Sequence, residues 1–259
     1  MINYDFHDLS KHTDEELERQ ITEGFIFGEY DSRDHDMFLI SRDAPSPDEK
    51  EIIETVPYMQ GVYDFSRLSG GERFFDNREI TYQVMLFENE YEMRKFPEQE
   101  IKDSLMTLGI QNLYDTHDRA YHWVGKCKSV TVEDDAEKGT LSATIVFDCY
   151  PFAYSNDAAG SDIWDDVYFP HWFFQETNFR VENKKKETIN LVNIGSKSVN
   201  SVIDVTGGVI ITGDFGRLVL KQGHYQDTQL VLAIGNNKLT LEGNPRGNVK
   251  FTFFIEEMI

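Results

Sequence analysis

The sequence of 259 residues has little positive charge, only two cysteines and no long apolar run. Its 46 acidic residues outnumber the 25 Lys and Arg residues, which gives a formal net charge of −21. A nucleic-acid-binding surface needs a basic footprint that displaces counterions, and an anionic membrane attracts basic segments. The charge therefore argues against specific nucleic-acid binding and against membrane binding.

Apolar runs are short throughout the chain, and the run at 207–212 is one of the longest. A helix that crosses a bilayer needs about 20 apolar residues. The N-terminus is polar and acidic, and it does not begin with the basic and then apolar segments of a secretory signal peptide. The sequence thus predicts synthesis in a cytoplasm without secretion by a signal peptide.

The two cysteines, Cys127 and Cys149, are too few for a disulfide framework. If the segments on either side of the charged loop 133–139 form a hairpin, Cys127 lies opposite Ile145. Cys149 then lies four residues farther along the same face, about 13 Å away, which is too far for a disulfide. We expect two buried free thiols.

Motifs for catalysis are absent: the sequence has no serine nucleophile elbow, P-loop, zinc-spaced histidine pair or CxxC. The acidic stretch 31–36 lacks the glycine and the distal glutamate of a calcium loop, so a solvated turn is the simpler interpretation. A turn at 118–119 separates His117 and Asp118 from His122. We therefore predict no enzymatic activity, no cofactor and no metal site.

An aromatic and acidic stretch at 162–174 suggests one alternative. Paired acids beside tryptophans occur in sugar-binding grooves and glycosidases. Packing of the aromatic side chains onto the domain, with the acids facing water, explains the same pattern more simply. The candidates for saccharide binding are Trp164, Trp172, Asn178 and Arg180.

The segment 139–154 organises the chain. Residues 140–149 alternate between apolar and polar positions with a period of two, as a half-buried strand requires. Pro151 ends the strand, and the small polar residues 155–160 then suit a domain boundary. We expect an N-terminal domain at 1–154 and a C-terminal domain at 155–259.

The N-terminal half is rich in expected strands and has one clear amphipathic helix. Pro97 suits the first helical position and Gly109 suits the end, with Ile101, Leu105 and Leu108 on one face. After residue 178, short strands alternate with turns that we expect at 207–208, 213–214, 235–237 and 243–245. Such spacing is typical of a β-sandwich.

The order of several motifs resembles that of the distal tail proteins of long, non-contractile-tailed bacteriophages, particularly those that infect Gram-positive hosts. These motifs are GFIFGEY at 24–30, ETVP at 54–57, GVYDF at 61–65, the strand 78–87 and FDCYPFAY at 147–154. The resemblance covers about the first 155 residues, whereas the remainder is similar only in its pattern of short strands and turns.

This resemblance implies a mainly β fold, with a tail-tube-like N-terminal β-sandwich or barrel containing one helix and a galectin-like C-terminal β-sandwich. It implies a homo-hexameric ring in the virion, at the distal tail and baseplate. The expected partners are the tail tube protein, the tail-associated (tape-measure or lysin) protein and upper baseplate or receptor-binding proteins. DNA would only pass through the channel of the ring.

We expect subunit contacts from residues 32–58 and 70–77. The individual candidates are Arg33, Met37, Pro45, Pro57, Tyr58, Arg73 and Phe74. The alternative function is that of a carbohydrate-binding protein, which would use the C-terminal sandwich to bind sugars of the host wall.

Overall fold

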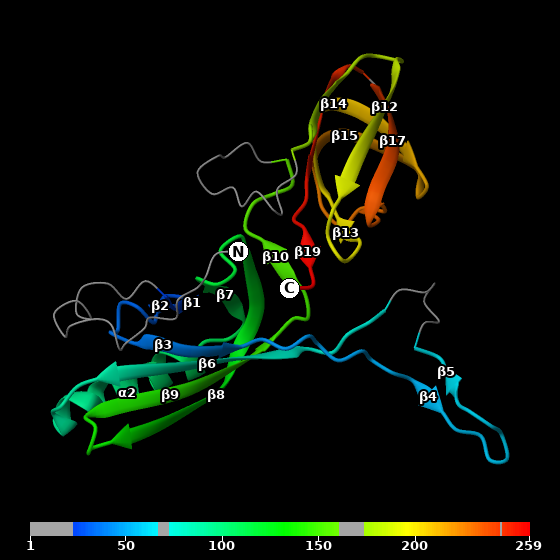
Figure 1. Ribbon diagram of the computed structural model, residues 1–259. Coiled ribbons are helices and arrows are strands. Elements are labelled where there is room, and N and C mark those ends of the chain that lie inside the picture. The colour runs from blue at the N-terminus through cyan, green and yellow to red at the C-terminus, as the bar shows by residue number, and fades with distance from the viewer. Residues whose placement is uncertain (1–22, 67–72, 161–173, 244) are drawn as a thin grey trace. The chain divides into compact units, whose positions relative to one another are not determined.

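The computed structural model describes residues 23–66, 73–160, 174–243 and 245–259 (Figure 1). The chain divides after Pro151 into two compact units, 1–151 and 152–259. Strands dominate both units, and α2 is the one α-helix in the part of the chain that is described. The predicted mainly β fold is confirmed.

The N-terminal unit is built on an antiparallel sheet. Its strands lie side by side in the order β2 (Tyr30–Asp31), β1 (Phe25–Phe27), β7 (Gln111–Asp115), β8 (Tyr121–Asp135), β9 (Thr140–Cys149), β6 (Arg78–Phe87) and β3 (Phe38–Asp43). The alternation predicted for β9 is confirmed, because Leu141, Ala143, Ile145, Phe147 and Cys149 are all buried. They face a core in which the rings of Phe25 and Tyr82 stack with centroids 4.8 Å apart.

The hairpin of β8 and β9 differs from the predicted register. Cys127 lies opposite Phe147 rather than Ile145, and a bulge falls between Cys127 and Ser129. Strand β8 continues through 133–135, which we assigned to the loop, so the connection shrinks to 136–139, whereas β9 begins at Thr140 as predicted. A tertiary contact explains the extension: Asp134 binds the guanidinium of Arg94 on the helix. Both thiols are buried and free, as predicted.

The two thiols should make the protein less stable at alkaline pH. Burial raises the pKa of Cys127 to about 11 and that of Cys149 to about 12. An unfolded thiol ionises near pH 8.5, so above that pH the folded chain holds protons that the unfolded chain has released. The free energy of unfolding should fall by about 1.4 kcal/mol per thiol for each pH unit between about 9 and 11. Urea titrations across this range would measure the slope.

A variant that carries Cys127→Ala and Cys149→Ala is the control for this slope. Its stability at pH 8 will be lower because of the lost side-chain packing, so only the pH dependence is compared. A slope equal to that of the unaltered chain would show that other groups cause the alkaline loss.

The helix α2 (Tyr91–Met106) begins six residues earlier than predicted, and Pro97 lies inside it. The first turn is fixed by Arg94, which is 2% exposed, binds Asp134 and donates a hydrogen bond to the carbonyl of Glu88 at 2.6 Å. Pro97 removes a single helical hydrogen bond near the N-terminus. Ile101 and Leu105 are buried as predicted, and the helix ends at Met106, with Thr107 as its C-cap, before it reaches Gly109.

The C-terminal unit contains a six-stranded sheet in which β15 (Gly216–Tyr225) pairs with the central strand of a five-strand path. That path runs β11 (Asn178–Val181), β18 (Gly247–Thr252), β14 (Val202–Gly213), β17 (Gly235–Gly243) and β12 (Lys186–Asn193). Two further pairs complete the unit: β13 (Val199–Asn200) with β16 (Val231–Leu232), and β10 (Ala153–Ser155) with β19 (Glu256–Glu257). One apolar cluster, which includes Leu191, Ile203, Leu232 and Phe251, forms its core.

Two predicted turns are wrong, because both lie inside strands. The register of β14 shifts between Val205 and Gly208, so 206–207 form a bulge that includes Gly207, and 235–237 are the first residues of β17. The first half of β14 pairs with β18 and the second half with β17. The bulge lies between these two halves, where β14 changes its pairing partner. Gly207 has a φ of +89°, and a Cβ on Gly247 would lie 1.5 Å from the carbonyl oxygen of Thr206. The glycines are needed for this close approach of two backbones.

Candidate functional site

A long excursion between β3 and β6 carries more than half of the exposed large apolar side chains among the described residues of the N-terminal unit. We call residues 44–77 the arm. Its two sides are joined by backbone hydrogen bonds of 2.8 Å from Lys50 to Phe74, from Asp76 to Asp48 and from Phe65 to Ile52. Farther out, β4 (Ile53–Glu54) pairs with β5 (Tyr63–Asp64). The described part of the arm is therefore a two-stranded ribbon (Figure 1).

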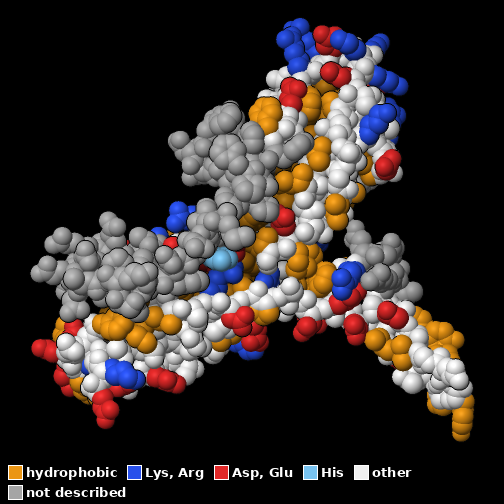
Figure 2. All heavy atoms as spheres, viewed as in Figure 1, with side chains coloured by type: hydrophobic (Ala, Val, Ile, Leu, Met, Phe, Trp, Pro, Cys, Tyr) orange, Lys and Arg blue, Asp and Glu red, His pale blue; other side chains and the backbone are white. Residues whose placement is uncertain are grey.

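Large apolar side chains along the arm are exposed, and Figure 2 shows them gathered toward its outer end. Eight of them are at least one-third exposed: Ile52, Ile53, Val56, Tyr58, Val62, Tyr63, Phe65 and Phe74. An isolated two-stranded hairpin is marginally stable in water, and contiguous exposed apolar surface marks an interaction site. The arm thus has the properties of a segment that is stabilised by contact with another molecule.

Tyr58 has an unusual backbone conformation at the turn of the arm. Its φ is +65°, in the left-handed region that bulky residues rarely adopt, and its side chain is fully exposed. A hydrogen bond of 3.2 Å from the amide of Met59 to the carbonyl of Val56 closes the turn around it. The conformation therefore presents an aromatic ring to solvent at a cost in backbone energy.

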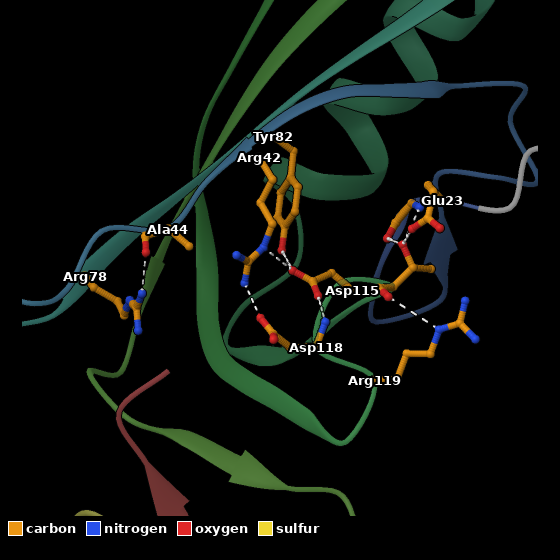
Figure 3. A network of polar contacts seen from close by, with 10 residues as sticks. Glu23, Arg42, Ala44, Arg78, Tyr82, Asp115, Asp118 and Arg119 are labelled. Atoms are coloured by element: carbon orange, nitrogen blue, oxygen red, sulfur yellow. Dashed lines mark hydrogen bonds and ion pairs between the residues drawn. The ribbon is translucent and has the colours of Figure 1, made fainter. Parts of the chain in front are cut away.

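Two arginines hold the root of the arm. Arg78, at the start of β6, is 2% exposed and donates a hydrogen bond of 2.7 Å to the carbonyl of Ala44 on the opposite side of the arm (Figure 3). Arg42, near the end of β3, turns inward and lies 5.2 Å from the ring centroid of Trp123. Both strands that enter the arm are thus fixed where they leave the sheet.

Arg42 belongs to a buried polar network (Figure 3). Asp115 accepts hydrogen bonds of 2.7 Å from Arg42 Nε and from the hydroxyl of Tyr82, and its side chain is fully buried. Asp118 accepts a second hydrogen bond from Arg42, at 2.6 Å. Burial and the charge of Asp115 raise the pKa of Tyr82 well above its usual value, so the phenol stays protonated. The geometry joins β3, β6 and the β7–β8 turn.

The residues predicted for subunit contacts fall in different environments. Pro45, Pro57, Tyr58, Arg73 and Phe74 lie on the arm, where Arg73 pairs with Glu49. Arg33 follows β2 and binds Asp31 through an ion pair of 2.5 Å.

Met37 does not fit its predicted contact role, because the structure places it in the core at 1% exposure. Its side chain fills the interior beside the turn that joins β2 to β3. It is therefore not on the surface of the folded chain.

The groups considered for metal binding have other contacts. Asp31 pairs with Arg33, and His35 stacks on Tyr30 with its Nδ1 3.3 Å from a carboxylate oxygen of Glu100. Asp118 holds Arg42. Within the described ranges, no group of three or more His, Cys, Asp or Glu side chains is placed to hold a metal ion. None of the described helices is long and apolar enough to span a membrane.

The saccharide candidates are only partly described. Trp164 and Trp172 lie outside the described residues. Asn178 and Arg180 are exposed on β11, whereas Phe179 between them packs on the core, 6.1 Å from the ring of Phe251.

Sequence reasoning missed the network at the arm root. Arg42 and Asp115 are 73 residues apart, and no local pattern connects them. The alternation of β6 does place Tyr82 inside, and a buried hydroxyl needs a partner. That requirement was the one available signal, and it does not identify Asp115.

Comparison with known proteins supports a shared fold. The crystal structure of the SPP1 Dit protein, described as a paradigm of the hub adsorption apparatus in Gram-positive infecting phages, aligns with a TM-score of 0.62. The alignment covers 90% of this chain and 98% of that chain at 11% identity. The predicted combination of a β-rich N-terminal unit with one helix and a C-terminal β-sandwich is thereby confirmed.

Two structures of the phage P2 baseplate in its activated conformation, one with Ca and one with Sr, align less closely. Each has a TM-score of 0.44 and covers 90% of this chain and 97% of the matched chain, at 10% and 11% identity respectively. No family model matches the sequence. No curated protein matches it either.

Proposed function

We propose that this chain is a structural protein of a phage virion that assembles into a ring at the distal end of the tail. The ring would connect the tail tube to the baseplate and to the receptor-binding proteins. The observation that carries this proposal is the arm, which is pinned at its root and exposes eight large apolar side chains. Such a ribbon suits a protein whose working state is an assembly.

The fold supports the same conclusion. SPP1 Dit is described as a hub of an adsorption apparatus, and it shares its architecture with nearly the whole of this chain. The low sequence identity means that the likeness is one of fold. The function follows only when the fold is combined with the arm and with the ordered motifs of the first 155 residues.

A closed ring needs a heterologous contact, in which one surface of a copy binds a different surface of the next copy. The arm provides one such surface, because it leaves the sheet between β3 and β6 and ends in exposed side chains. We propose six copies per ring, on the basis of the resemblance to distal tail proteins. The tail-associated protein and the tail tube protein would bind to the faces of this ring.

The bare face of the N-terminal sheet suits the wall of a DNA channel. Helix α2 packs on the other face, where Ile101 and Leu105 are buried. On the bare face, Gln83 of β6 lies opposite Thr144 of β9 and Met85 opposite Ser142, whereas Glu79 and Asp148 pair with Lys128 and Lys126 of β8. Both of these lysines are paired with carboxylates, and the net charge of −21 repels DNA. DNA would pass without being held.

The solution mass of the purified chain tests the ring. Light scattering should give about 180 kDa, six times the chain mass of 30.1 kDa. Negative-stain images of the same sample should show six-fold rings with a central hole. A monomer at every concentration, also after addition of the tail tube protein, would contradict the proposal.

A further inference from the structure

Helix α2 turns one face away from the sheet, and this face changes from apolar to acidic along its length. Met93 and Phe96 lie near the start of the helix, three residues apart, and are 51% and 67% exposed. Glu100 and Asp103 continue the same line at intervals of four and three residues, and both are exposed. The buried residues of the helix lie on its other side. We call these four exposed residues the α2 stripe.

A pocket of about 590 Å³ lies at the C-terminal end of this stripe, and we call it the α2 pocket. Glu29 of the β1–β2 turn and Asp103 of the helix both line it, whereas no lysine or arginine does. Neither carboxylate has a cationic partner among the described residues. The C-terminal end of a helix carries a partial negative charge, and the last turn of α2 has no basic residue to offset it.

A buried hydroxyl without a partner belongs to the wall of this pocket. Tyr30 lines the pocket and is 4% exposed, and its hydroxyl makes no hydrogen bond with the described residues. The ring of His35, which also lines the pocket, stacks on Tyr30 with centroids 4.5 Å apart and has its Nδ1 3.3 Å from a carboxylate oxygen of Glu100. Burial and the charges of Glu100 and Asp31 raise the pKa of Tyr30 well above its usual value. The potential here is therefore negative, and the phenol oxygen can accept a hydrogen bond from a cation.

The basic residues closest in sequence do not neutralise the pocket. Lys102 is paired with Glu98 at 2.6 Å, and Arg33 is paired with Asp31 at 2.5 Å. Acidic side chains at the negative end of a helix are unfavourable for the stability of the free chain. Proteins break such a local rule mainly at functional sites, so the uncompensated acids indicate that a cation binds here.

The chemistry of this surface favours a basic protein segment as its occupant. An ammonium or guanidinium group in the pocket would pair with the two carboxylates and donate to the hydroxyl of Tyr30. At 1.5 Å per residue, Phe96 and Asp103 are about 10 Å apart along the helix axis, so an apolar side chain of the same segment would reach the start of the stripe. The arm of a second copy does not fit, because residues 51–65 contain three acidic residues but no Lys or Arg. Nucleic acids are excluded by the same negative potential.

We propose that the α2 stripe and the α2 pocket bind a basic segment of another tail protein. A lysine or arginine side chain of that segment enters the pocket, and an apolar side chain packs on Met93 and Phe96. The inference rests on the proposed function for the class of partner, whereas the surface itself is defined by its charge and burial.

Fluorescence polarisation with labelled peptides tests this surface on the full chain at physiological salt. The probe is an eight-residue peptide with three lysines and two leucines, and a second peptide has glutamates in place of the lysines. The chain should bind the first peptide and not the second. Glu29→Gln combined with Asp103→Asn should raise the dissociation constant of the lysine peptide at least tenfold, as expected for two lost charge-assisted contacts.

Glu187→Gln combined with Asp214→Asn is the matched control. Both side chains are exposed acids of the C-terminal unit, so this variant loses the same charge at another place. Its dissociation constant for the lysine peptide should stay within about twofold of that of the unaltered chain, because distant surface charges are screened. The comparison separates binding at the pocket from general attraction to an acidic protein.

Two further variants test the apolar stripe and the buried hydroxyl. Met93→Ser combined with Phe96→Ser should weaken peptide binding about tenfold, as for truncated interface residues. Tyr30→Phe should also weaken it about tenfold, the effect of a lost hydrogen bond to a charged group. It should not lower the free energy of unfolding of the free chain, because the hydroxyl that it removes has no partner there. A hydroxyl with a merely structural role would show the opposite pattern.

The outcomes separate this inference from the proposed ring. If the variant of Glu29 and Asp103 binds the lysine peptide as tightly as the control variant does, or if the unaltered chain does not bind it, the inference is wrong. Light scattering of the same variant should show an unchanged mass, and loss of the ring would instead assign the surface to a second copy and overturn the inference. A chain that binds the peptide but is monomeric under all conditions would contradict the ring alone.

Discussion

A chain in which residues 47–77 are replaced by Asn-Gly is expected to stay folded and to be monomeric, since the register of β3 with β6 places 46 opposite Arg78. Asn-Gly suits a two-residue turn between antiparallel strands, so β3 and β6 can be joined directly. The replacement retains Ala44, Arg78 and the network of Arg42, which hold the strand ends. It removes all eight exposed apolar side chains of the arm. Light scattering should therefore give a mass close to that of one chain.

The expected loss of assembly is large because the arm carries eight of the fifteen exposed large apolar side chains among the described residues of the N-terminal unit. Circular dichroism should show that the strands are retained, and the melting temperature should change little. The control carries Val219→Asp and Ile234→Asp, which are exposed apolar positions of the C-terminal unit at 56% and 59%. This control should assemble normally. If the chain without the arm still formed a six-fold ring, the arm would not be needed for assembly.

Asp115→Ala is expected to be the most destabilising single substitution at the arm root. It leaves the hydroxyl of Tyr82 unpaired in a fully buried position and leaves Arg42 with Asp118 alone. Removing one partner of a buried ion pair costs about 3–5 kcal/mol, since the other charge stays buried without compensation. Because Arg42 keeps Asp118, we expect about 3 kcal/mol. The N-terminal unit should then unfold at a markedly lower urea concentration.

The measurement needs a signal from this unit alone. Trp123 is fully buried beside Arg42, so its fluorescence reports on the network. Trp164→Phe and Trp172→Phe leave it as the sole tryptophan of the three in the chain. Tyr82→Phe is the matched control, which removes one hydrogen bond and should cost about 1 kcal/mol. An equal loss in both variants would show that the charge of Asp115 contributes little.

Local patterns predicted the regular elements well. The period of two in 140–149 predicted β9, and the same alternation predicted β6 at its observed bounds. The helix was predicted in the right place but not at the right start, because Arg94 fixes its first turn through Asp134, 40 residues away. The same ion pair extends β8 beyond its predicted end. Both differences arise from one tertiary contact that the sequence does not display.

The glycine-containing turns also show where local sequence patterns fail to predict the structure. Gly207 was interpreted as a hairpin turn because local chemistry does not distinguish a turn from a bulge. The structure makes it a bulge, since β14 must pair with β18 in one half and with β17 in the other. For the arm, the sequence predicted a segment that is not self-sufficient. Only the folded structure shows which side chains of the arm are exposed to solvent.

By itself, the sequence determined the class of fold, the single amphipathic helix, the free buried thiols and the acidic charge. Periodicity, composition and turn chemistry are local properties, so the chain displays them without its partners in space. Only the tertiary structure decided the register of β8 with β9, the burial of Met37 and the network that holds the arm. Each of these depends on residues far apart in the sequence, whose contacts form because the folded core buries them together.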